Sequence, residues 1–569
     1  MAAALPQYGW ILAVTTIAFV FSSFGNGAND VANSFATSVA ARSLTMAQAG
    51  VISILAEFLG AVVLGSRVTN TIKNGIISLE PFRKSPSVLM TAMGSAEISS
   101  ATWLMVATRL GFPVSTTHTI VGSLIGAGIG SQAGVTWSWK SGSVSQIAAS
   151  WLIAPLIGAA FSATIFATLK FCVLERQDPF QKAMRAIPFY LAFTCAVLAL
   201  FITVEAPTAA SLEEMGAGTA CAIVLGTFFG TLIIAYVFFL PYLHRVVVLQ
   251  DERMRPWHIP MGPLLRRENP PLYWPGKGAM LVDHYLSTHE KHQRANDANG
   301  GEEAAEAATA AQQTAKQEKD VENPSSDRDA DPPATSSIRP PGPHERFLAP
   351  VAHLPLYHPR RARGLLLFGF LQGVTRDCVT HSSSRLEAVH GKAPRYDNRI
   401  EHLWTYPQVL SAIMMSVAHG SNDVANAVGP WAAVYQTYET GQVGSRSPAP
   451  VWILAVAGFL LGAGFWIMGY HIVRSLGNKI TQLSPTRGFA MELGAAITVL
   501  LASRLSLPIS TTQTITGAVV GVSLMNLDWG ATNWRQLAFI FLGWVLTLPV
   551  AGLLSGLLTA MALNVPQFV

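Results

Sequence analysis

The length of its apolar runs most constrains how this chain can fold. WLIAPLIGAAFSATIFATL (151–169) and GTACAIVLGTFFGTLIIAYVFFL (218–240) each reach the roughly 20 residues that a helix needs to cross hydrocarbon. Only 12% of the 569 residues are charged and 50% are hydrophobic, which is about half the charge of a soluble domain. We therefore expect an all-α polytopic membrane protein. Shorter runs lie near 9–24, 48–65, 88–108, 113–130, 187–204, 406–418, 451–472, 489–503, 508–525 and 536–562.

The distribution of Lys and Arg predicts the orientation of the chain. Segments 170–186 and 244–267 are basic, whereas the loop at 205–218 is acidic and contains neither Lys nor Arg. The positive-inside rule places both basic segments in the cytoplasm, and the N-terminus, which lacks positive charge, outside. The first run has no small-residue cleavage site, so we do not expect a cleaved signal peptide.

Composition divides the chain into three regions: two membrane regions at 1–243 and 405–569, and a cytoplasmic insert at 244–404. Within the insert, 294–345 is rich in Ala, Pro and acidic residues and is predicted to be disordered. The apolar part of RRARGLLLFGFLQG (360–373) is too short to span a membrane, which favours a surface-lying or re-entrant helix. The four cysteines show no paired spacing, so neither a disulfide framework nor a metal site is expected.

Two motifs recur in the same order in the two membrane regions. GANDVAN (27–33) returns as GSNDVAN (420–426), and EISSATWLMVATRLGFPVSTTHTIVG (97–122) returns as ELGAAITVLLASRLSLPISTTQTITG (492–517). The aspartate of the first motif precedes the serine of the second by 85 residues in one copy and by 87 in the other. Duplicated units with Gly- and Pro-broken apolar segments are typical of secondary transporters, whose substrate sites lie near mid-membrane between the repeats.

Each P-x-S-T-T motif predicts a helix N-terminus that binds an anion. Proline removes a donor and ends or opens a helical segment, and Ser and Thr are favoured N-caps. Free N–H groups, the positive end of the helix dipole and three hydroxyls suit a tetrahedral oxyanion. Alternatively, the hydroxyls bond back to their own helix or serve as packing contacts. The candidate phosphate ligands are Ser115, Thr116, Thr117, Ser510, Thr511, Thr512, Asp30 and Asp423.

Each NDVAN motif predicts a site for a hard cation. Its two asparagines and its aspartate fall on neighbouring parts of one helix face, and Gly25 and Gly27 favour a break in the backbone before the first copy. Carboxylate, amide and bare carbonyl oxygens are ligands that Na⁺ prefers. A simple helix cap would not explain two acids in apolar segments, because intramembrane acids are usually functional. The candidate sodium ligands are Asn29, Asp30, Asn33, Asn422, Asp423 and Asn426.

Together the two motifs predict co-transport. An anion beside two carboxylates is repelled by an energy on the order of several kcal/mol unless a cation intervenes. Anion and cation affinities then depend on each other. A proton on the aspartates, or a metal–phosphate complex, would serve the same purpose. Phosphate is favoured over sulfate because it keeps a proton at neutral pH and can donate it to a carboxylate.

These motifs resemble those of the inorganic phosphate transporter (PiT) family. GANDVANSFATSV and GSNDVANAVG are similar to its duplicated GGNDVANAFGTSV-like motif, and PVSTTHTIVG and PISTTQTITG to its second motif. The long insert looks most like that of fungal plasma-membrane sodium–phosphate symporters. The resemblance implies about twelve transmembrane helices, with broken or re-entrant ones, in two inverted-topology repeats, and both termini outside. It also implies phosphate symport by alternating access, driven by Na⁺ or in some members by H⁺, with the NDVAN and STT residues as the sites.

The sequence departs from the family pattern in details. Ala28 and Ser421 replace the second glycine of the first motif, and Ala36 replaces another. His118 is matched by Gln513 in the second copy. His118 can titrate and so favours some proton involvement, but a packed, hydrogen-bonded helix residue is an equal alternative.

Three further acids lie in apolar runs. Glu97 and Glu492 each precede their STT by 18 residues, and this duplication favours a role in gating or coupling. A structural ion pair is the alternative, with Arg109 and Arg504 as candidate partners, although each could instead snorkel to the interface. The third acid, Glu57, has no duplicated counterpart, so its role in gating is less strongly indicated.

Other functions remain open at this point. A sulfate or metal–phosphate transporter, a phosphate-sensing receptor with little transport, and a channel are the alternatives. The sequence shows no nucleophile–base set or nucleotide loop, so we expect neither an enzyme nor a bound cofactor. The expected partners are inorganic phosphate, Na⁺ and the lipid bilayer, without nucleic acid, and a homodimer is left open.

Overall fold

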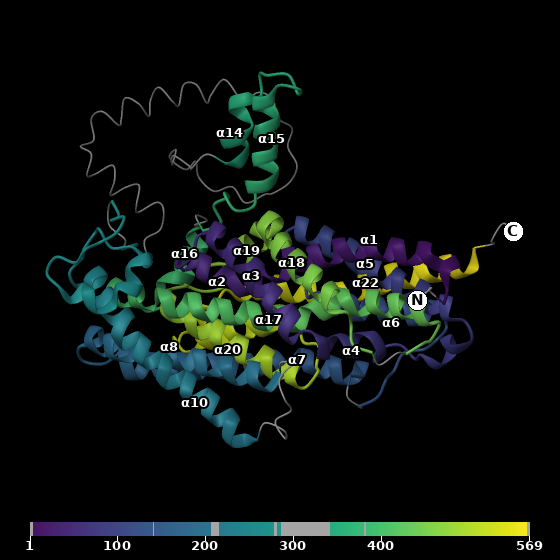
Figure 1. The fold of residues 1–569 in the computed structure, drawn as a ribbon, viewed down its shortest axis with the longest axis horizontal. Coiled ribbons are helices and arrows are strands. Elements are labelled where there is room, and N and C mark those ends of the chain that lie inside the picture. Colours follow the sequence, from purple (N-terminus) through teal and green to yellow (C-terminus); the bar gives the residue numbers. More distant parts are fainter. Residues whose placement is uncertain are drawn as a thin grey trace.

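Long helices form where the sequence carries apolar runs, and many of them lie side by side along the long axis of the molecule (Figure 1). This computed structural model describes residues 4–139, 142–205, 216–277, 281–285, 342–379, 383–444 and 447–565. The all-α prediction is confirmed, because within these ranges the regular elements are helical and the β pairing is limited to one bridge, Ile77 to Val135. The stretch predicted to be disordered, 294–345, lies almost wholly outside the described residues, and so does most of the acidic loop.

The first half of the chain forms a series of helices up to the start of the insert. Short 3-10 or π elements interrupt or flank them: η1 (Pro6–Tyr8), η2 (Glu80–Lys84), η3 (Lys170–Leu174), η4 (Ala235–Phe239) and η5 (His244–Val248). The helices are α1 (Gly9–Asp30), α2 (Ala32–Ala40), α3 (Met46–Leu64), α4 (Ser66–Asn74), α5 (Pro86–Arg109), α6 (Thr116–Gly130), α7 (Val144–Leu169), α8 (Pro179–Glu205), α10 (Ala217–Ile234) and α11 (Leu240–Leu243).

The insert contributes shorter helices, and the second half returns to long ones. In the insert these are η6 (Pro256–Arg266), α14 (Pro343–Phe347), η7 (Ala349–Val351), α15 (Pro359–Leu371) and α16 (Ser384–Gly391). They are followed by α17 (Asn398–Thr440), α18 (Val451–Met468), α19 (Tyr470–Leu476), α20 (Pro485–Arg504), α21 (Thr511–Leu524), η8 (Trp529–Ala531) and α22 (Trp534–Asn564). The predicted short helix of the insert, α15, packs on α14 and projects from the bundle (Figure 1).

Seven helical segments of the described chain are long and apolar enough to cross a membrane. Helices α5, α17 and α20 pack among them but carry many buried polar side chains, which lowers their hydropathy. Helices α6 and α21 also pack among them but are shorter, with 15 and 14 residues. The count of twelve spans therefore stays a prediction. The seven segments are Pro6–Ala40, Met46–Leu64, Val144–Leu174, Pro179–Val204, Ala217–Val248, Val451–Met468 and Trp534–Asn564.

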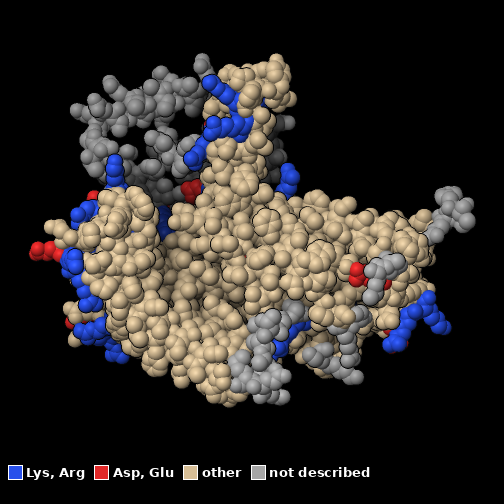
Figure 2. Space-filling view, viewed as in Figure 1, with Lys and Arg blue, Asp and Glu red and all other residues tan. Residues whose placement is uncertain are grey.

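The surface agrees with a membrane protein. In the view of Figure 2, Lys and Arg gather at the two ends of the long axis and on the projecting helices, and the band between them is nearly free of charge. Aromatic and aliphatic side chains of the candidate spans are exposed, for example Leu152, Phe229 and Leu553. Such an apolar belt is stable only when lipid covers it.

The two halves of the chain are interleaved rather than side by side. Helix α6 packs on α22, and its counterpart α21 packs on α7. Helix α1 likewise packs against α18, and α17 against α3. These crossings depend on glycine: a Cβ on Gly27 would lie 1.9 Å from the Leu461 carbonyl oxygen, and one on Gly60 would lie 2.2 Å from that of Val417. The backbones therefore touch directly where the two motif-bearing helices cross their neighbours.

A short segment of the insert, 281–285, docks between the two halves. The Arg42 guanidinium donates to the Asp283 carbonyl at 3.1 Å, and the His284 ring contacts the Ala41 carbonyl at 2.8 Å. On the other side, the Tyr285 hydroxyl donates to the buried carboxylate of Glu401 in α17. This segment is therefore bound both to the first membrane region and to the start of α17.

Candidate substrate and cation site

Both STT motifs begin a helix, as the sequence predicts. The Ser115 hydroxyl caps α6 by accepting from the His118 N–H at 3.1 Å, and Ser510 caps α21 by accepting from the Gln513 N–H at 3.2 Å. The loops that carry Pro113 and Pro508 lead into these caps. All six Ser and Thr side chains are buried, so both helix N-termini point into the protein.

The break expected at Gly25 and Gly27 is not there. Helix α1 continues through both glycines and is interrupted at Val31, and α17 runs unbroken through the second copy of the motif. The glycines serve close packing instead: a Cβ on Gly27 would collide with the backbone of α18, and one on Gly25 would lie a tight 3.2 Å from the Leu104 side chain of α5. The bare carbonyl ligands that such a break would supply are therefore not provided by these glycines.

The first asparagine of each motif holds the loop that precedes the STT triplet. Each carboxamide donates twice and accepts once, and both side chains are fully buried. These bonds use both amide hydrogens and one lone pair of the amide oxygen, so only the second lone pair of that oxygen is left to bind a cation. The partners are Thr108, Phe112 and Val114 for Asn29, at 3.0, 3.0 and 3.1 Å, and Ser503, Leu507 and Ile509 for Asn422, at 3.1, 3.1 and 3.2 Å.

The two aspartates share hydroxyl partners at the centre of the bundle. The Thr116 hydroxyl lies 2.8 Å from Asp30 Oδ2 and 3.2 Å from Asp423 Oδ2. The Thr511 hydroxyl lies 3.1 Å from the same oxygen of Asp423 and 3.4 Å from that of Asp30. A hydroxyl carries one proton, so each threonine can donate to only one carboxylate at a time.

The remaining motif residues are joined across the repeats. The Thr512 hydroxyl donates to Asp30 Oδ1 at 2.9 Å and receives a bond from Asn33 at 2.9 Å. From the second half to the first, Asn426 of α17 donates to the Thr117 hydroxyl of α6 at 3.3 Å. The predicted site residues of the two motifs thus form one buried cluster, built from both halves of the chain.

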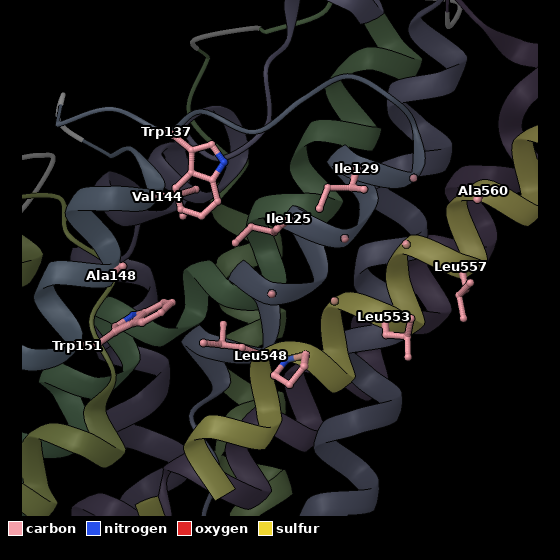
Figure 3. Close-up of a pocket in the computed structure, with 16 residues that line it drawn as sticks. Ile125, Ile129, Trp137, Val144, Ala148, Trp151, Leu548, Leu553, Leu557 and Ala560 are labelled. Atoms are coloured by element: carbon pink, nitrogen blue, oxygen red, sulfur yellow. The ribbon is translucent and has the colours of Figure 1, made fainter. Parts of the chain in front are cut away.

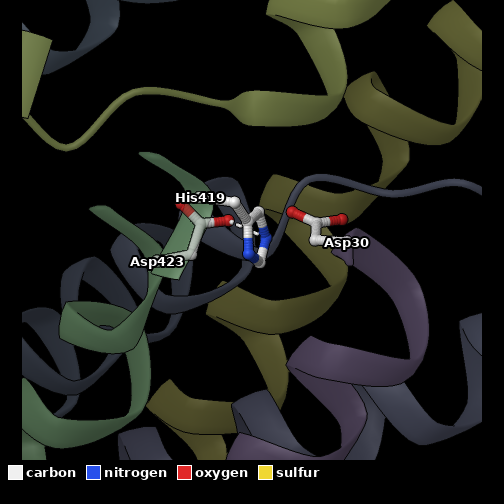
Figure 4. Close-up of side chains that lie close together, drawn as sticks. All are labelled: Asp30, His419 and Asp423. Carbon is white, nitrogen blue, oxygen red and sulfur yellow. Dashed lines mark ion pairs between the residues drawn. The ribbon is translucent and has the colours of Figure 1, made fainter. Parts of the chain in front are cut away.

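Sequence reasoning missed one member of this cluster, His419. Its Nε2 lies 3.1 Å from Asp423 and its Nδ1 lies 2.8 Å from Glu57, whose other oxygen accepts from Ser416. Ligand atoms of His419 and of the two central aspartates lie within 4.8 Å of one another (Figure 4). The sequence signal that could have found His419 is its position, four residues or one helical turn before Asp423. Asn26 occupies the same position before Asp30 in the first copy.

The two carboxylates repel each other strongly at this separation. At 4.8 Å and an effective dielectric constant of about 20, two negative charges repel by about 3–4 kcal/mol. A positive charge or a proton is therefore required in the cluster. Several buried acceptor oxygens around it have no hydrogen-bond partner among the described residues: Asn26 Oδ1, Asn33 Oδ1, Asn426 Oδ1 and Asp423 Oδ1.

The duplicated glutamates have different surroundings. Glu492 accepts hydrogen bonds from Thr37 and Ser38 of α2, both at 2.6 Å, and from Ser411 and Gln408 of α17 at 2.7 and 3.3 Å. Glu97 is equally buried, yet neither of its oxygens accepts a hydrogen bond from the described residues.

Neither glutamate is paired with its candidate arginine within the described chain. Arg109 is exposed at the end of α5, and Arg504 donates to the Val204 carbonyl at 3.4 Å. The oxygens of Glu97 are free of such partners, and those of Glu492 are taken by hydroxyl and amide donors. The interpretation of these pairs as structural ion pairs is therefore wrong.

His118 lies apart from the carboxylates. Its ring packs on that of Trp151 with 4.1 Å between centroids. The amide oxygen of its counterpart, Gln513, is buried without a hydrogen-bond partner among the described residues. Trp151 lines a separate apolar cavity of about 770 Å³ between α6, α7 and α22 (Figure 3). This cavity carries no charged lining residue, so it suits lipid or packing rather than phosphate.

The fold and the site define a multi-pass helical membrane protein whose duplicated halves enclose one buried polar cluster. The pattern of the PHO4 phosphate transporter family matches residues 26–555, and the chain belongs to this family. It is 39% identical to the phosphate-repressible phosphate permease pho-4 of Neurospora crassa, over 99% of each chain. It is 27% identical to sodium-dependent phosphate transporter 2 of Xenopus tropicalis, over 97% of each. A solved structure titled "The sodium-dependent phosphate transporter" aligns with a TM-score of 0.64 at 25% identity, covering 98% of this chain and all of the other.

Proposed function

We propose that this protein is a secondary active symporter that takes up inorganic phosphate together with Na⁺ by alternating access. The observation that carries the proposal is that the hydroxyls of both STT motifs are bound to Asp30 and Asp423. Phosphate would need these same donors. Phosphate therefore competes with the two carboxylates unless something else neutralises them.

Sodium supplies that neutralisation. A cation bound to a carboxylate relieves the repulsion between the two aspartates and weakens their hold on the hydroxyls. The unpaired amide oxygens of Asn33 and Asn426 would complete the ligand set. Asn426 follows Asp423 by three residues in α17, and Asn33 follows Asp30 by three residues at the start of α2. Asn29 and Asn422 would act indirectly, by holding the STT loops in place. Phosphate affinity then rises with Na⁺ occupancy, and the reverse holds by linkage.

Proton coupling is the second candidate, favoured by His419. Its two ring nitrogens face two carboxylates, so a neutral ring can satisfy only one of them as a donor. Either the imidazole is doubly protonated or one of the acids carries the proton. The chain Glu57–His419–Asp423 therefore holds a proton beside the substrate site, and that proton can replace a cation.

Alternating access requires contacts that break on one side of the site. The Glu492 network joins α2 of the first half to α17 and α20 of the second, which supports a role as a gate. The Lys and Arg distribution supports a cytoplasmic insert at 244–404 between membrane regions at 1–243 and 405–569, with both termini outside. In this orientation the Glu492 network lies between the site and the cytoplasm, and the plasma membrane is the proposed location.

The test is uptake of radiolabelled phosphate into proteoliposomes under an inward Na⁺ gradient or an inward H⁺ gradient. Wild type is compared with Asp30→Asn and Asp423→Asn, which remove one charge each and keep the side-chain size. Asp178→Asn is the matched control, because Asp178 is exposed outside the cluster. We expect Na⁺-driven uptake in wild type and in the control, and loss of at least tenfold in both cluster variants.

Each other outcome has a distinct meaning. Uptake driven by H⁺ alone would replace the sodium assignment by proton coupling. Phosphate binding without accumulation would indicate a sensing receptor. Equal competition by sulfate would contradict the proposed selectivity for an anion that can donate a proton.

A further inference from the structure

A pocket lined by arginines lies at one end of the bundle, away from the carboxylate cluster. This pocket of about 530 Å³ opens between the start of α8 and the end of the α10–η5 segment, and residues 265–268 close its side. The two segments are adjacent candidate membrane spans, and the pocket lies at the ends of both. It is therefore at the level of the lipid headgroups, on the side that the Lys and Arg distribution predicts to be cytoplasmic.

The wall of the pocket is held rigidly by a buried arginine. Arg245 donates to the carbonyl oxygens of Leu265, Arg267 and Glu268, and it also pairs with Asp251 at 3.2 Å. Hydrogen bonds from Arg253 lower the pKa of Asp251, so this carboxylate stays ionised at any pH near neutral. The backbone of the loop that carries the neighbouring cations is thus fixed to the helix end, so only their side chains have to be ordered when a ligand binds.

The ligand-facing cations are Arg266 and Arg267. Both are exposed, and neither guanidinium forms an ion pair within the described part of the chain. His244 lies beside them, and Glu268 is the pocket's one acid. Planar guanidinium groups bind phosphate oxygens in pairs, which makes a phosphate-bearing group the chemistry that fits.

The rest of the pocket is apolar. Leu240, Pro241 and Leu265 contribute to its lining, and Leu249 is 54% exposed at its edge. A soluble phosphate compound would leave this apolar surface in water, whereas a lipid would cover it with an acyl chain. Basic pockets between membrane helices on the cytoplasmic side commonly take anionic headgroups.

We propose that this pocket binds an anionic phospholipid, with its phosphate-bearing headgroup on Arg266 and Arg267 and its acyl chain against Leu240 and Leu249. The site is separate from the carboxylate cluster, and the inference does not depend on the coupling ion or on transport. The occupancy of this pocket would then depend on the lipid composition of the membrane.

The test is binding of phosphatidylinositol 4-phosphate to the purified full-length protein, counted by native mass spectrometry, with phosphatidylcholine as the neutral lipid. We expect the Arg266→Gln/Arg267→Gln variant to bind the anionic lipid about thirtyfold more weakly, at about a factor of five to six for each charge removed. Arg360→Gln/Arg363→Gln is the matched control, since it removes two cations of α15 outside the pocket. Glu268→Gln removes the opposing acid and is expected to tighten binding about fivefold.

Unchanged binding in the pocket variants would overturn the proposal. Full displacement of the lipid by soluble inositol phosphate or by inorganic phosphate would also overturn it, and would assign the pocket to a soluble phosphate compound. The melting temperature of each variant without lipid shows that it is folded, and Glu268→Gln keeps the test decisive if the double variant is unstable.

Discussion

Asn29 and Asn422, 393 positions apart, make the same set of hydrogen bonds in the two halves of the molecule. Each carboxamide receives a backbone N–H from its own STT loop and donates to a carbonyl of that loop. The two copies of the sequence motif therefore have the same hydrogen-bond geometry. Each half positions its own STT loop, and the loops then supply hydroxyls to both aspartates.

Removing either asparagine should destabilise the protein. Asn29→Ala or Asn422→Ala leaves a buried N–H and a buried carbonyl without a partner, at about 1–3 kcal/mol for each unpaired group. We expect a lower melting temperature and loss of phosphate uptake. Asn526→Ala is the control, because the Asn526 carboxamide has no hydrogen-bond partner among the described residues. Equal melting temperatures in all three variants would argue against the tethering role.

The threonines that touch the carboxylates should affect phosphate affinity. Thr116→Val and Thr511→Val keep the shape but remove the shared hydroxyls, so we expect the KM for phosphate to rise about tenfold or more, since a hydrogen bond to a charged group contributes about 1.5–3 kcal/mol. Thr→Ser at these positions should restore most of the affinity. Thr102→Val, on the exposed face of α5, is the control. A normal KM in both valine variants would remove these hydroxyls from the substrate site.

The two duplicated glutamates should respond oppositely to neutralisation. Glu492→Gln puts an NH₂ group among four donors, so we expect lower stability and at least tenfold slower uptake. Glu97→Gln replaces a buried carboxyl whose oxygens have no hydrogen-bond partner among the described residues by an amide of the same size that cannot ionise, so we expect an equal or higher melting temperature. Melting curves of the purified variants check this prediction. A larger fall for Glu97→Gln than for Glu492→Gln would show that the contacts of Glu492 contribute little.

The glycine in the first motif should not tolerate a side chain. Gly27→Ala places a methyl group 1.9 Å from a backbone oxygen of α18, and neither backbone can move aside without disturbing the site. We expect little folded protein by size-exclusion chromatography. Gly226→Ala in α10 is the control, because no atom lies within 4 Å of its added Cβ, and alanine favours a helix by about 1 kcal/mol. Normal folding of Gly27→Ala would mean that the helices cross less closely.

The protein's own contribution to the pH dependence of uptake should originate at His419. His419→Asn gives the second repeat the residue that the first has at Asn26, and it removes the group between Glu57 and Asp423. At saturating Na⁺ we expect the pH profile of uptake to lose the contribution of this imidazole and to keep only that of phosphate's own protonation. His118→Gln, which copies Gln513, should keep the wild-type profile. A reversed result would make His118 the titrating group.

Much of the fold and of the site could be predicted from the sequence, for a physical reason. Apolar runs long enough to span a membrane have few alternatives to helices, and acids within them need partners. The repetition of Asp30 as Asp423 and of Ser115 as Ser510 showed which polar groups belong together. The prediction that each STT motif stands at a helix N-terminus is confirmed, because the signal is local and the preceding proline removes the helical alternative.

The features that were wrong or missed depend on tertiary contacts. Gly25 and Gly27 were expected to break a helix, but they serve helix crossing, which spacing along one chain segment does not reveal. Arg109 and Arg504 were candidate partners of the glutamates, yet Glu492 is satisfied by hydroxyls from a helix more than 450 residues away in sequence. His419 differs from its counterpart Asn26, so a search restricted to identical positions in the two repeats passes over it.

The bond between Thr512 and Asp30 also has a consequence for biosynthesis. The two residues are separated by 482 positions, and ribosomes add about 5–20 residues per second. Asp30 therefore leaves the ribosome roughly half a minute to a minute and a half before its partner exists. During that interval Asp30 Oδ2 can accept from Thr116 of the same half, but Oδ1 must stay in water or carry a proton. Insertion of the first helix into the bilayer is thus expected to be completed only when the last helices arrive.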